Sequence, residues 1–148
     1  MAPSAIELSA ARHALAQGFL LPLMVSMAAR DDIQYVLDRA RLRSLFSVVV
    51  SAEDVNVTKP APDCYRAGFE KLNDQRRGKR LLPVLAGECL VIEDSPPGIQ
   101  SGRSAGMRTI GVTNTVAEKE LRAAGAEVVS ASLADWTVDA VHHLFSQG

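Results

Sequence analysis

Several features that mark whole classes of protein are scarce in this chain. It has only two cysteines in 148 residues, Cys64 and Cys89, and they lie far apart, so we expect inert thiols and neither a disulfide framework nor a zinc cluster. Positive charge is not in excess, because the formal net charge is -1, which argues against a nucleic-acid partner. The longest apolar stretch, residues 19–25, is about a third of a membrane span. With no recognisable secretory leader, we expect a cytoplasmic protein with no membrane partner.

What the chain does contain is an alternation of short apolar segments and amphipathic ones. Its length and its 47% of hydrophobic residues predict one domain with a single core. Strands are expected over residues 19–25, 46–50, 89–92, 108–112 and 127–129, and helices over residues 4–17, 31–40, 96–105, 117–124 and 138–145 and directly after residues 59–63. This alternation predicts an α/β fold with a parallel sheet. Residues 73–87, which include a basic cluster at 76–80, are predicted to form a long solvated loop.

One segment, residues 89–99, carries a strong chemical signal. Four apolar residues predict a strand buried on both faces, and Ser95-Pro96 predicts a helix cap followed by proline in the first turn. Glu93 and Asp94 therefore lie at the carboxyl end of the strand, where ligands bind in open α/β sheets. Two adjacent acids at this place indicate a hard divalent cation such as Mg2+. The alternative is that they only complement the helix dipole.

Further polar residues are expected at strand ends or helix entries, namely Ser26, Lys59 and the turn at residues 113–115. In right-handed βαβ units these places converge on one edge of the sheet. We call the set of Ser26, Lys59, Glu93 and Asp94 the rim. A hydroxyl and a lysine can hold phosphate oxygens while acids hold a metal, so the rim predicts a phosphoryl-transfer pocket. Taken singly, Ser26 could only end a strand and Lys59 could be a solvated loop charge.

These segments resemble the haloacid dehalogenase-like hydrolases, specifically the phosphoglycolate phosphatase and β-phosphoglucomutase branch. Residues 50–63 resemble the third motif of that family, whose lysine, here Lys59, contacts the phosphoryl group and the nucleophile. Residues 91–107 resemble the fourth motif, whose acids, here Glu93 and Asp94, bind Mg2+. Ser26 matches the second motif, whose hydroxyl binds a phosphoryl oxygen. The resemblance implies a Rossmann-like three-layer parallel sheet, a Mg2+ cofactor and a small phosphorylated metabolite as ligand.

The chain departs from the family pattern at the first motif, an apolar strand followed by Asp-x-Asp that supplies the nucleophile. No Asp-x-Asp occurs in the 148 residues. By resemblance, residues 1–148 form a single partial core domain without a cap domain, equivalent to the C-terminal portion of the family. We interpret the nearest acids, Asp31, Asp32 and Asp54, as helix caps or turn residues. Because Lys59 and Ser26 cannot replace a carboxylate nucleophile, the chain alone is expected to be inactive or weakly active.

The absence of the first motif also implies that the sheet lacks a strand. By resemblance its strand lies between the strand that ends at Ser26 and the strand that ends at Glu93, so without it two edges would be unpaired. The two strands could pair directly, another chain could donate a strand, or the native gene product could be longer. For the isolated chain we expect direct pairing or a homodimer through the exposed sheet edge.

Other functions fit the sequence less well than a hydrolase. A non-catalytic module that binds metal and phosphate, or another protein, remains the alternative. A receiver-like signalling domain would need acids after an early strand and a phosphoacceptor aspartate in mid-chain, and neither is in place. A dinucleotide-binding domain is excluded because no Gly-x-Gly-x-x-Gly follows any predicted strand.

Overall fold

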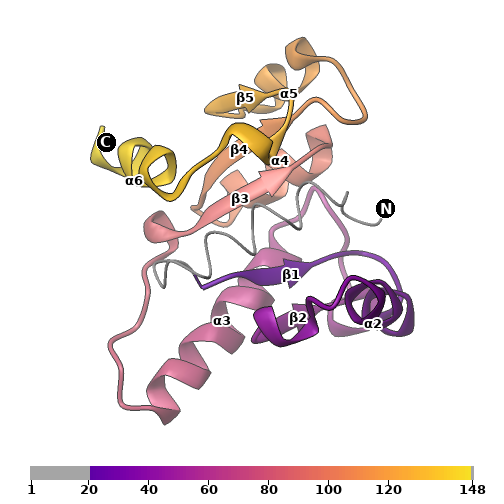
Figure 1. Ribbon diagram of the computed structural model, residues 1–148, viewed down its shortest axis with the longest axis vertical. Coiled ribbons are helices and arrows are strands. Elements are labelled where there is room, and N and C mark those ends of the chain that lie inside the picture. Colours follow the sequence, from indigo (N-terminus) through magenta and orange to yellow (C-terminus); the bar gives the residue numbers. More distant parts are fainter. Residues whose placement is uncertain (1–20, 148) are drawn as a thin grey trace.

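The computed structural model describes residues 21–147, in which strands alternate with helices along the chain (Figure 1). The strands are β1 (Leu23–Val25), β2 (Val48–Val50), β3 (Leu90–Glu93), β4 (Arg108–Val112) and β5 (Val128–Ser130). The α-helices are α2 (Arg30–Arg39), α3 (Asp63–Gly78), α4 (Pro96–Ser104), α5 (Glu118–Ala124) and α6 (Val138–Ser146). The predicted alternation is confirmed, while the predicted helix at 4–17 and the first two residues of the predicted strand at 19–25 lie outside the described residues.

The strands form two parallel sheets. β1 pairs with β2, with Leu23 opposite Val48, and β3, β4 and β5 form a second sheet in that order. The predicted α/β class with parallel strands is therefore confirmed. Direct pairing of β1 with β3, one of the two expected outcomes, is wrong, because no hydrogen bond between described residues joins them. Helix α3 packs on β1 and β2 and also contacts α4, which packs on β3 and β4, so these two helices link the two sheets.

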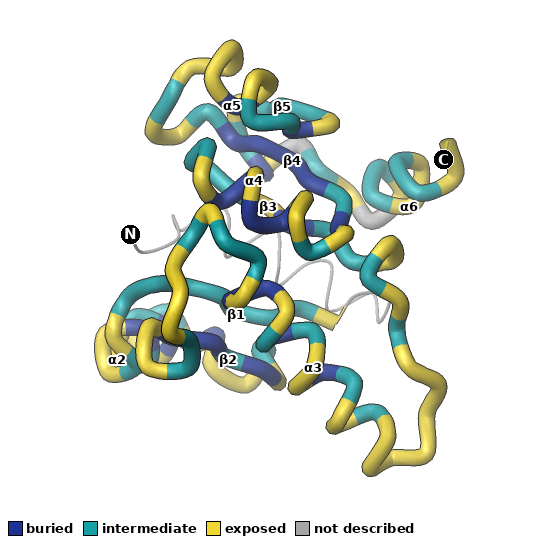
Figure 2. The backbone as a smooth tube through the Cα atoms, turned by 180° about the vertical axis from the view of Figure 1, so that it is seen from behind, coloured by how far each residue is buried: buried dark blue, intermediate teal, exposed yellow. Residues whose placement is uncertain are grey.

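Side chains connect the two sheets where backbone hydrogen bonds do not. One buried cluster draws residues from both, and Figure 2 shows burial concentrated along β2, β4 and parts of α3 and α4. Its members are Val48, Val50, Cys64, Tyr65, Leu72, Val91 and Met107. Since Cys64, Tyr65 and Leu72 all come from α3, this helix is the central element of the core. Within the described residues, no helix has both the length and the apolar content needed to cross a bilayer.

Helix α3 is longer than the sequence analysis predicted. Residues 73–78, which were predicted to begin a loop, continue the helix to Gly78. The reason is that glutamine and arginine have high helix propensity, so a hydrophilic run does not end a helix until glycine appears. Arg76 and Arg77 lie in the last turn, where cations interact favourably with the helix dipole. The loop prediction holds only for residues 79–85, which lie between α3 and the short 3-10 turn at Ala86–Glu88.

Helix α4 begins almost directly after β3 because its first turn is capped as predicted. The Ser95 hydroxyl accepts a hydrogen bond from the Gly98 N–H at 3.3 Å, and Pro96 and Pro97 fill the first turn. Further along, a Cβ on Gly102 would lie 3.0 Å from the side chain of Val91, so the helix packs unusually close to the strand. These contacts fix the end of β3, which carries Glu93 and Asp94, relative to α4.

Candidate phosphate and metal site

The rim residues come from elements that end or begin on one side of the molecule. Figure 1 shows the arrowheads of β1 and β3 pointing the same way. Ser26 follows β1 directly, and Glu93 and Asp94 stand at the end of β3. Lys59 precedes α3 and reaches Glu93. The carboxyl ends of parallel strands are where open α/β sheets bind ligands, so the structure places the rim residues where the sequence analysis predicts a site.

The best defined contact at the rim joins Lys59, Tyr65 and Glu93. The Glu93 carboxylate accepts hydrogen bonds from the Lys59 ammonium and from the Tyr65 hydroxyl. The side chains of Lys59 and Glu93 are only 16% and 9% exposed, and the Lys59 Nζ lies 5.1 Å from the centre of the Tyr65 ring. Burial, and then the negative charge of Glu93, raise the pKa of Tyr65 well above its ordinary value. The phenol therefore stays protonated and serves as a donor.

Gly98 lies so close to Glu93 that any larger residue there would have to displace the Glu93 carboxylate. A Cβ on Gly98 would lie 2.1 Å from the Glu93 carboxyl carbon, which no real contact allows. The Ser95 hydroxyl also donates to Glu93 at 3.4 Å. The first turn of α4 thus closes over the Glu93 carboxylate, and the positive end of the helix dipole lies beside a negative charge.

Asp94 is held by different partners from those of Glu93. Its Oδ2 accepts a hydrogen bond from the Thr115 hydroxyl at 2.6 Å. Thr115 lies in the turn after β4, one of the places that the sequence analysis assigned to the same edge of the sheet. The two adjacent carboxylates are therefore fixed independently, Glu93 by groups around α3 and Asp94 by the turn after β4.

Ser26 is placed at the end of β1 but does not touch the other rim residues. Its hydroxyl accepts a hydrogen bond from the Ala28 N–H at 3.1 Å, and its own N–H donates to the Val50 carbonyl at 3.0 Å. Within residues 21–147 it makes no hydrogen bond with Lys59 or with either acid. The structure thus brings Lys59 and Glu93 into contact and leaves Ser26 and Asp94 as separate groups near the strand ends.

The acids at the rim suit Mg2+ better than a structural metal centre. Among the described residues, no group of three or more histidine, cysteine, aspartate or glutamate side chains could hold a metal ion. Glu93 and Asp94 supply two carboxylates, and Mg2+ commonly takes only one or two together with water and phosphate oxygens. The donor set therefore fits a weakly held Mg2+ that depends on phosphate for part of its coordination.

The sequence analysis missed the role of Tyr65. It assigned this residue only to the apolar face of the helix after residue 63, where the structure does bury it to 8% exposure. The available signal was chemical, since the hydroxyl of a buried tyrosine needs a hydrogen-bond partner. The partner itself, Glu93, lies 28 residues away in the sequence and could not be identified from local pattern.

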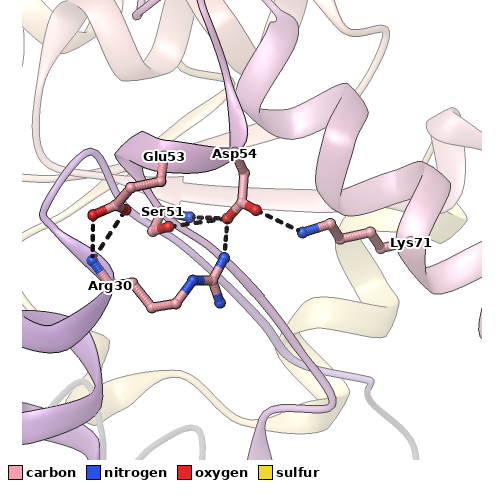
Figure 3. Close-up of polar contacts among 5 residues, drawn as sticks. All are labelled: Arg30, Ser51, Glu53, Asp54 and Lys71. Atoms are coloured by element: carbon pink, nitrogen blue, oxygen red, sulfur yellow. Dashed lines mark hydrogen bonds and ion pairs between the residues drawn. The ribbon is translucent and has the colours of Figure 1, made fainter.

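A second polar cluster lies at the end of β2 and does not belong to the rim (Figure 3). Asp54 accepts hydrogen bonds from the Ser51 N–H at 2.8 Å, from the Lys71 ammonium at 3.1 Å and from the Arg30 guanidinium, while Glu53 accepts from the Arg30 N–H. The hydrogen bond from the Ser51 backbone, aided by Lys71, lowers the pKa of Asp54 to about 2. The interpretation of Asp54 as a turn-capping residue is confirmed, and its oxygens are committed to structure.

The depressed pKa of Asp54 predicts a pH-dependent contribution to stability. The folded state keeps this carboxylate charged down to about pH 2, whereas the ordinary pKa is 3.8. The stabilisation is therefore complete above about pH 4 and lost as the pH falls from 4 to 2. In urea unfolding, Asp54→Asn should be less stable than the parent by about 2 kcal/mol at pH 6, with a smaller difference at pH 3.

The matched control for this prediction is Asp74→Asn. Asp74 pairs with Arg77 on the same helix, and both side chains are more than two-thirds exposed, so its removal should matter little at either pH. An Asp54→Asn protein whose stability difference is the same at pH 6 and pH 3 would contradict the assignment.

Several known proteins have sequences similar to this chain. The sequence model of the haloacid dehalogenase-like hydrolases matches residues 6–106. The chain is 36% identical to the CbbY protein of Cupriavidus necator over 119 residues, which cover 78% of the chain and 42% of that protein. It is also 36% identical to the fructose-1-phosphate phosphatase YqaB of Escherichia coli over 92 residues, covering 62% of the chain and 44% of that protein.

A solved structure supports the fold. The chain matches a haloacid dehalogenase-like protein of unknown function from Agrobacterium tumefaciens with a TM-score of 0.74 and 27% identity, over 91% of the chain and 59% of that protein. The chain thus spans less than two thirds of the length of each of these three proteins.

Proposed function

Because this chain belongs to the haloacid dehalogenase-like hydrolase family, we propose that its rim binds Mg2+ and the phosphoryl group of a small phosphorylated metabolite. The observation that carries this proposal is the arrangement of Lys59, Glu93 and Asp94, in which a lysine and two separately held carboxylates share the carboxyl ends of the strands. The similarity to a fructose-1-phosphate phosphatase supports a phosphate monoester as ligand.

Each rim residue has a role that its contacts allow. Asp94 and Glu93 would hold the metal ion, which neutralises negative charge on a bound phosphoryl group. An ammonium has three donors, so Lys59 can donate to a phosphoryl oxygen while it still donates to Glu93. The Ser26 hydroxyl accepts from Ala28 and donates to no described residue, so its proton is free for a second phosphoryl oxygen.

We further propose that the 148-residue chain alone hydrolyses phosphate monoesters weakly or not at all. By the family resemblance, the phosphoryl acceptor would be a carboxylate at the rim other than the metal-binding pair. The sequence has no Asp-x-Asp, and Asp54 is bound by Ser51, Arg30 and Lys71. Asp31 and Asp32 lie in the first turn of α2, where acids complement the helix dipole. The chain would therefore bind phosphate without transferring it.

Calorimetric titration with Mg2+ in the presence of inorganic phosphate tests the binding proposal. The parent chain should bind Mg2+ weakly, and Asp94→Asn should weaken binding at least tenfold because one of two carboxylate ligands is lost. Asp74→Asn, which removes an exposed acid on α3, is the matched control and should bind as the parent does. Identical titration curves for the parent and Asp94→Asn would refute the metal site.

Hydrolysis of p-nitrophenyl phosphate tests the second proposal. With saturating Mg2+ the parent chain should release nitrophenol no faster than Asp94→Asn does. Robust turnover by the parent that Asp94→Asn abolishes would show that the chain contains its own nucleophile. A separate observation bears on the non-catalytic alternative, a module that binds another polypeptide: within residues 21–147, β1 pairs only with β2 and β3 pairs only with β4.

A further inference from the structure

Large apolar side chains are exposed at several places in residues 21–147. Most of them occur singly: Ile92, for example, is 46% exposed, so the prediction of a strand buried on both faces is wrong at this residue. Three others come from one loop, in which Leu81 is 50% exposed, Leu82 is 82% exposed and Leu85 is 65% exposed. We call residues 79–85 the leucine loop. Single exposed apolar residues are normal on a protein surface, whereas a group of them marks an interaction site.

Hydrogen bonds to α3 fix the backbone of the leucine loop. The Leu81 N–H donates to the Arg76 carbonyl at 2.9 Å, and the Arg76 Nε donates to the Leu82 carbonyl at 2.7 Å. The Asn73 side-chain amide accepts from the Val84 N–H at 2.8 Å and donates to the Val84 carbonyl at 3.0 Å. The leucines are therefore exposed on a loop of defined conformation. A partner that binds here does not need to order the loop first, which favours affinity.

The leucine loop lies at the end of α3 that is remote from the rim. Lys59 of the rim precedes α3, whereas the loop follows Gly78 at the other end of the helix. The 16 residues of α3 span about 24 Å. Figures 1 and 2 both show the chain between α3 and β3 running out from the strands, and Figure 2 shows most of it exposed. A partner on the loop would therefore not contact the metal and phosphate site directly.

Positive charge lies beside the exposed leucines. Arg76 and Arg77 are in the last turn of α3, and Lys79 and Arg80 are the first residues of the loop. Arg76 donates to the backbone of the loop, and Arg77 pairs with Asp74. The side chains of Lys79 and Arg80 are exposed and form no ion pair with any residue that the structure describes. These two cations are therefore available to carboxylates from outside the chain.

We propose that the leucine loop binds a segment of a partner polypeptide that carries both apolar side chains and carboxylates. Apolar side chains of the partner would remove the exposed leucines from water, and its acids would pair with Lys79 and Arg80. An anionic lipid surface fits less well, because clusters that bind such lipids typically have about four to eight cations and only these two lack an intramolecular partner. Asp74 and Glu88, which are exposed beside the loop, would also be repelled by a uniformly negative surface.

Neither residues 1–20 nor a second copy of the chain matches the charge of the leucine loop. Residues 1–20 contain one acid, Glu7, and one arginine, Arg12, so this segment offers no excess of negative charge to Lys79 and Arg80. A second copy that docked through the same surface would bring like charges together. The proposal does not depend on the proposed metal and phosphate site, and its test is run without Mg2+ or phosphate.

Selection of random peptides displayed on phage against the 148-residue chain tests the proposal without assuming one partner sequence. The selected peptides should combine apolar residues with aspartate or glutamate, and calorimetry should show binding of the synthetic peptide that is at least tenfold weaker to Leu82→Ser than to the parent. The matched control is Tyr35→Ser, which removes a side chain that is 62% exposed on α2 and should bind as the parent does. A selection that yields no acidic apolar peptide, or a peptide that binds Leu82→Ser as tightly as the parent, would overturn the proposal.

A charge reversal tests the pairing of the loop with carboxylates. The double variant Lys79→Glu and Arg80→Glu should bind the selected peptide at least tenfold more weakly, and it should bind the same peptide with lysine in place of its acids more tightly than the parent does. Lys119→Glu, which reverses an exposed charge on α5, is the control and should behave as the parent does. If the double variant still prefers the acidic peptide, the proposal is wrong.

Three results would assign the leucine loop to a different occupant, and each would overturn the proposal. A melting temperature of Leu82→Ser several degrees below that of the parent would mean that part of the same chain, such as residues 1–20, already covers Leu82. A dimer of the parent that Leu82→Ser dissociates would identify a second copy. Sedimentation of the parent, but not of Leu82→Ser, with phosphatidylserine vesicles would identify a lipid surface.

Discussion

Replacing Lys59 with methionine should lower the free energy of unfolding by about 3 kcal/mol, because it leaves a buried carboxylate without its cation. The Glu93 side chain is 9% exposed and that of Lys59 is 16% exposed, so water cannot easily replace the lost partner. The Tyr65 hydroxyl remains as a donor to Glu93 but carries no compensating charge. Urea unfolding at pH 7 without Mg2+ measures the loss.

A double-mutant cycle separates the ion pair from simple loss of packing. Glu93→Gln in the Lys59→Met background should recover part of the lost stability, since the buried charge is then gone. The control is Arg122→Met, which breaks a pair with Glu118 in which both side chains are more than half exposed, and which should change stability little. Equal losses in Lys59→Met and Arg122→Met would mean that the Lys59 pair is solvated.

The second large effect is expected at Ile110, in the middle of β4. This side chain is 0% exposed, so Ile110→Ala should cost about 3–4 kcal/mol through lost burial and the cavity that remains. The same substitution at Ile92, on the neighbouring strand, removes a side chain that is 46% exposed, and about 1 kcal/mol is expected. Urea unfolding of the two variants gives a direct comparison of one residue type in one sheet. Similar losses at both positions would show that Ile92 is covered, as the predicted strand buried on both faces would require, against its 46% exposure.

The order of strands and helices could be predicted from sequence because its signals are local. Ser95 and Pro96 mark the start of α4, and Gly125, with φ of 102°, marks the end of α5. Each depends only on residues within one turn of the chain. The end of α3 could not be predicted as reliably. Arginine and glutamine have high helix propensity, but a run of them without apolar residues is also typical of a solvated loop.

The residues of the candidate site could be predicted from the sequence, but the contacts between them could not. Lys59, Glu93 and Asp94 stand out by their place after or before regular elements. The contact of Lys59 with Glu93 spans 34 residues, and that of Tyr65 with Glu93 spans 28, so both depend on how α3 packs against α4. The exposure of Ile92 likewise depends on what lies beside β3, which an apolar run in the sequence cannot reveal.

The central place of α3 in the core has a consequence for how the molecule unfolds. This helix packs on β1 and β2, contacts α4, and carries Tyr65, which donates to Glu93. With no backbone ladder between β1 and β3 in residues 21–147, the two groups of strands are coupled through side chains of one helix. Native-state hydrogen exchange should then show two subglobal units of different stability. Substitutions on the buried face of α3, such as Leu72→Ala, should uncouple them, so that the two units melt at separate temperatures.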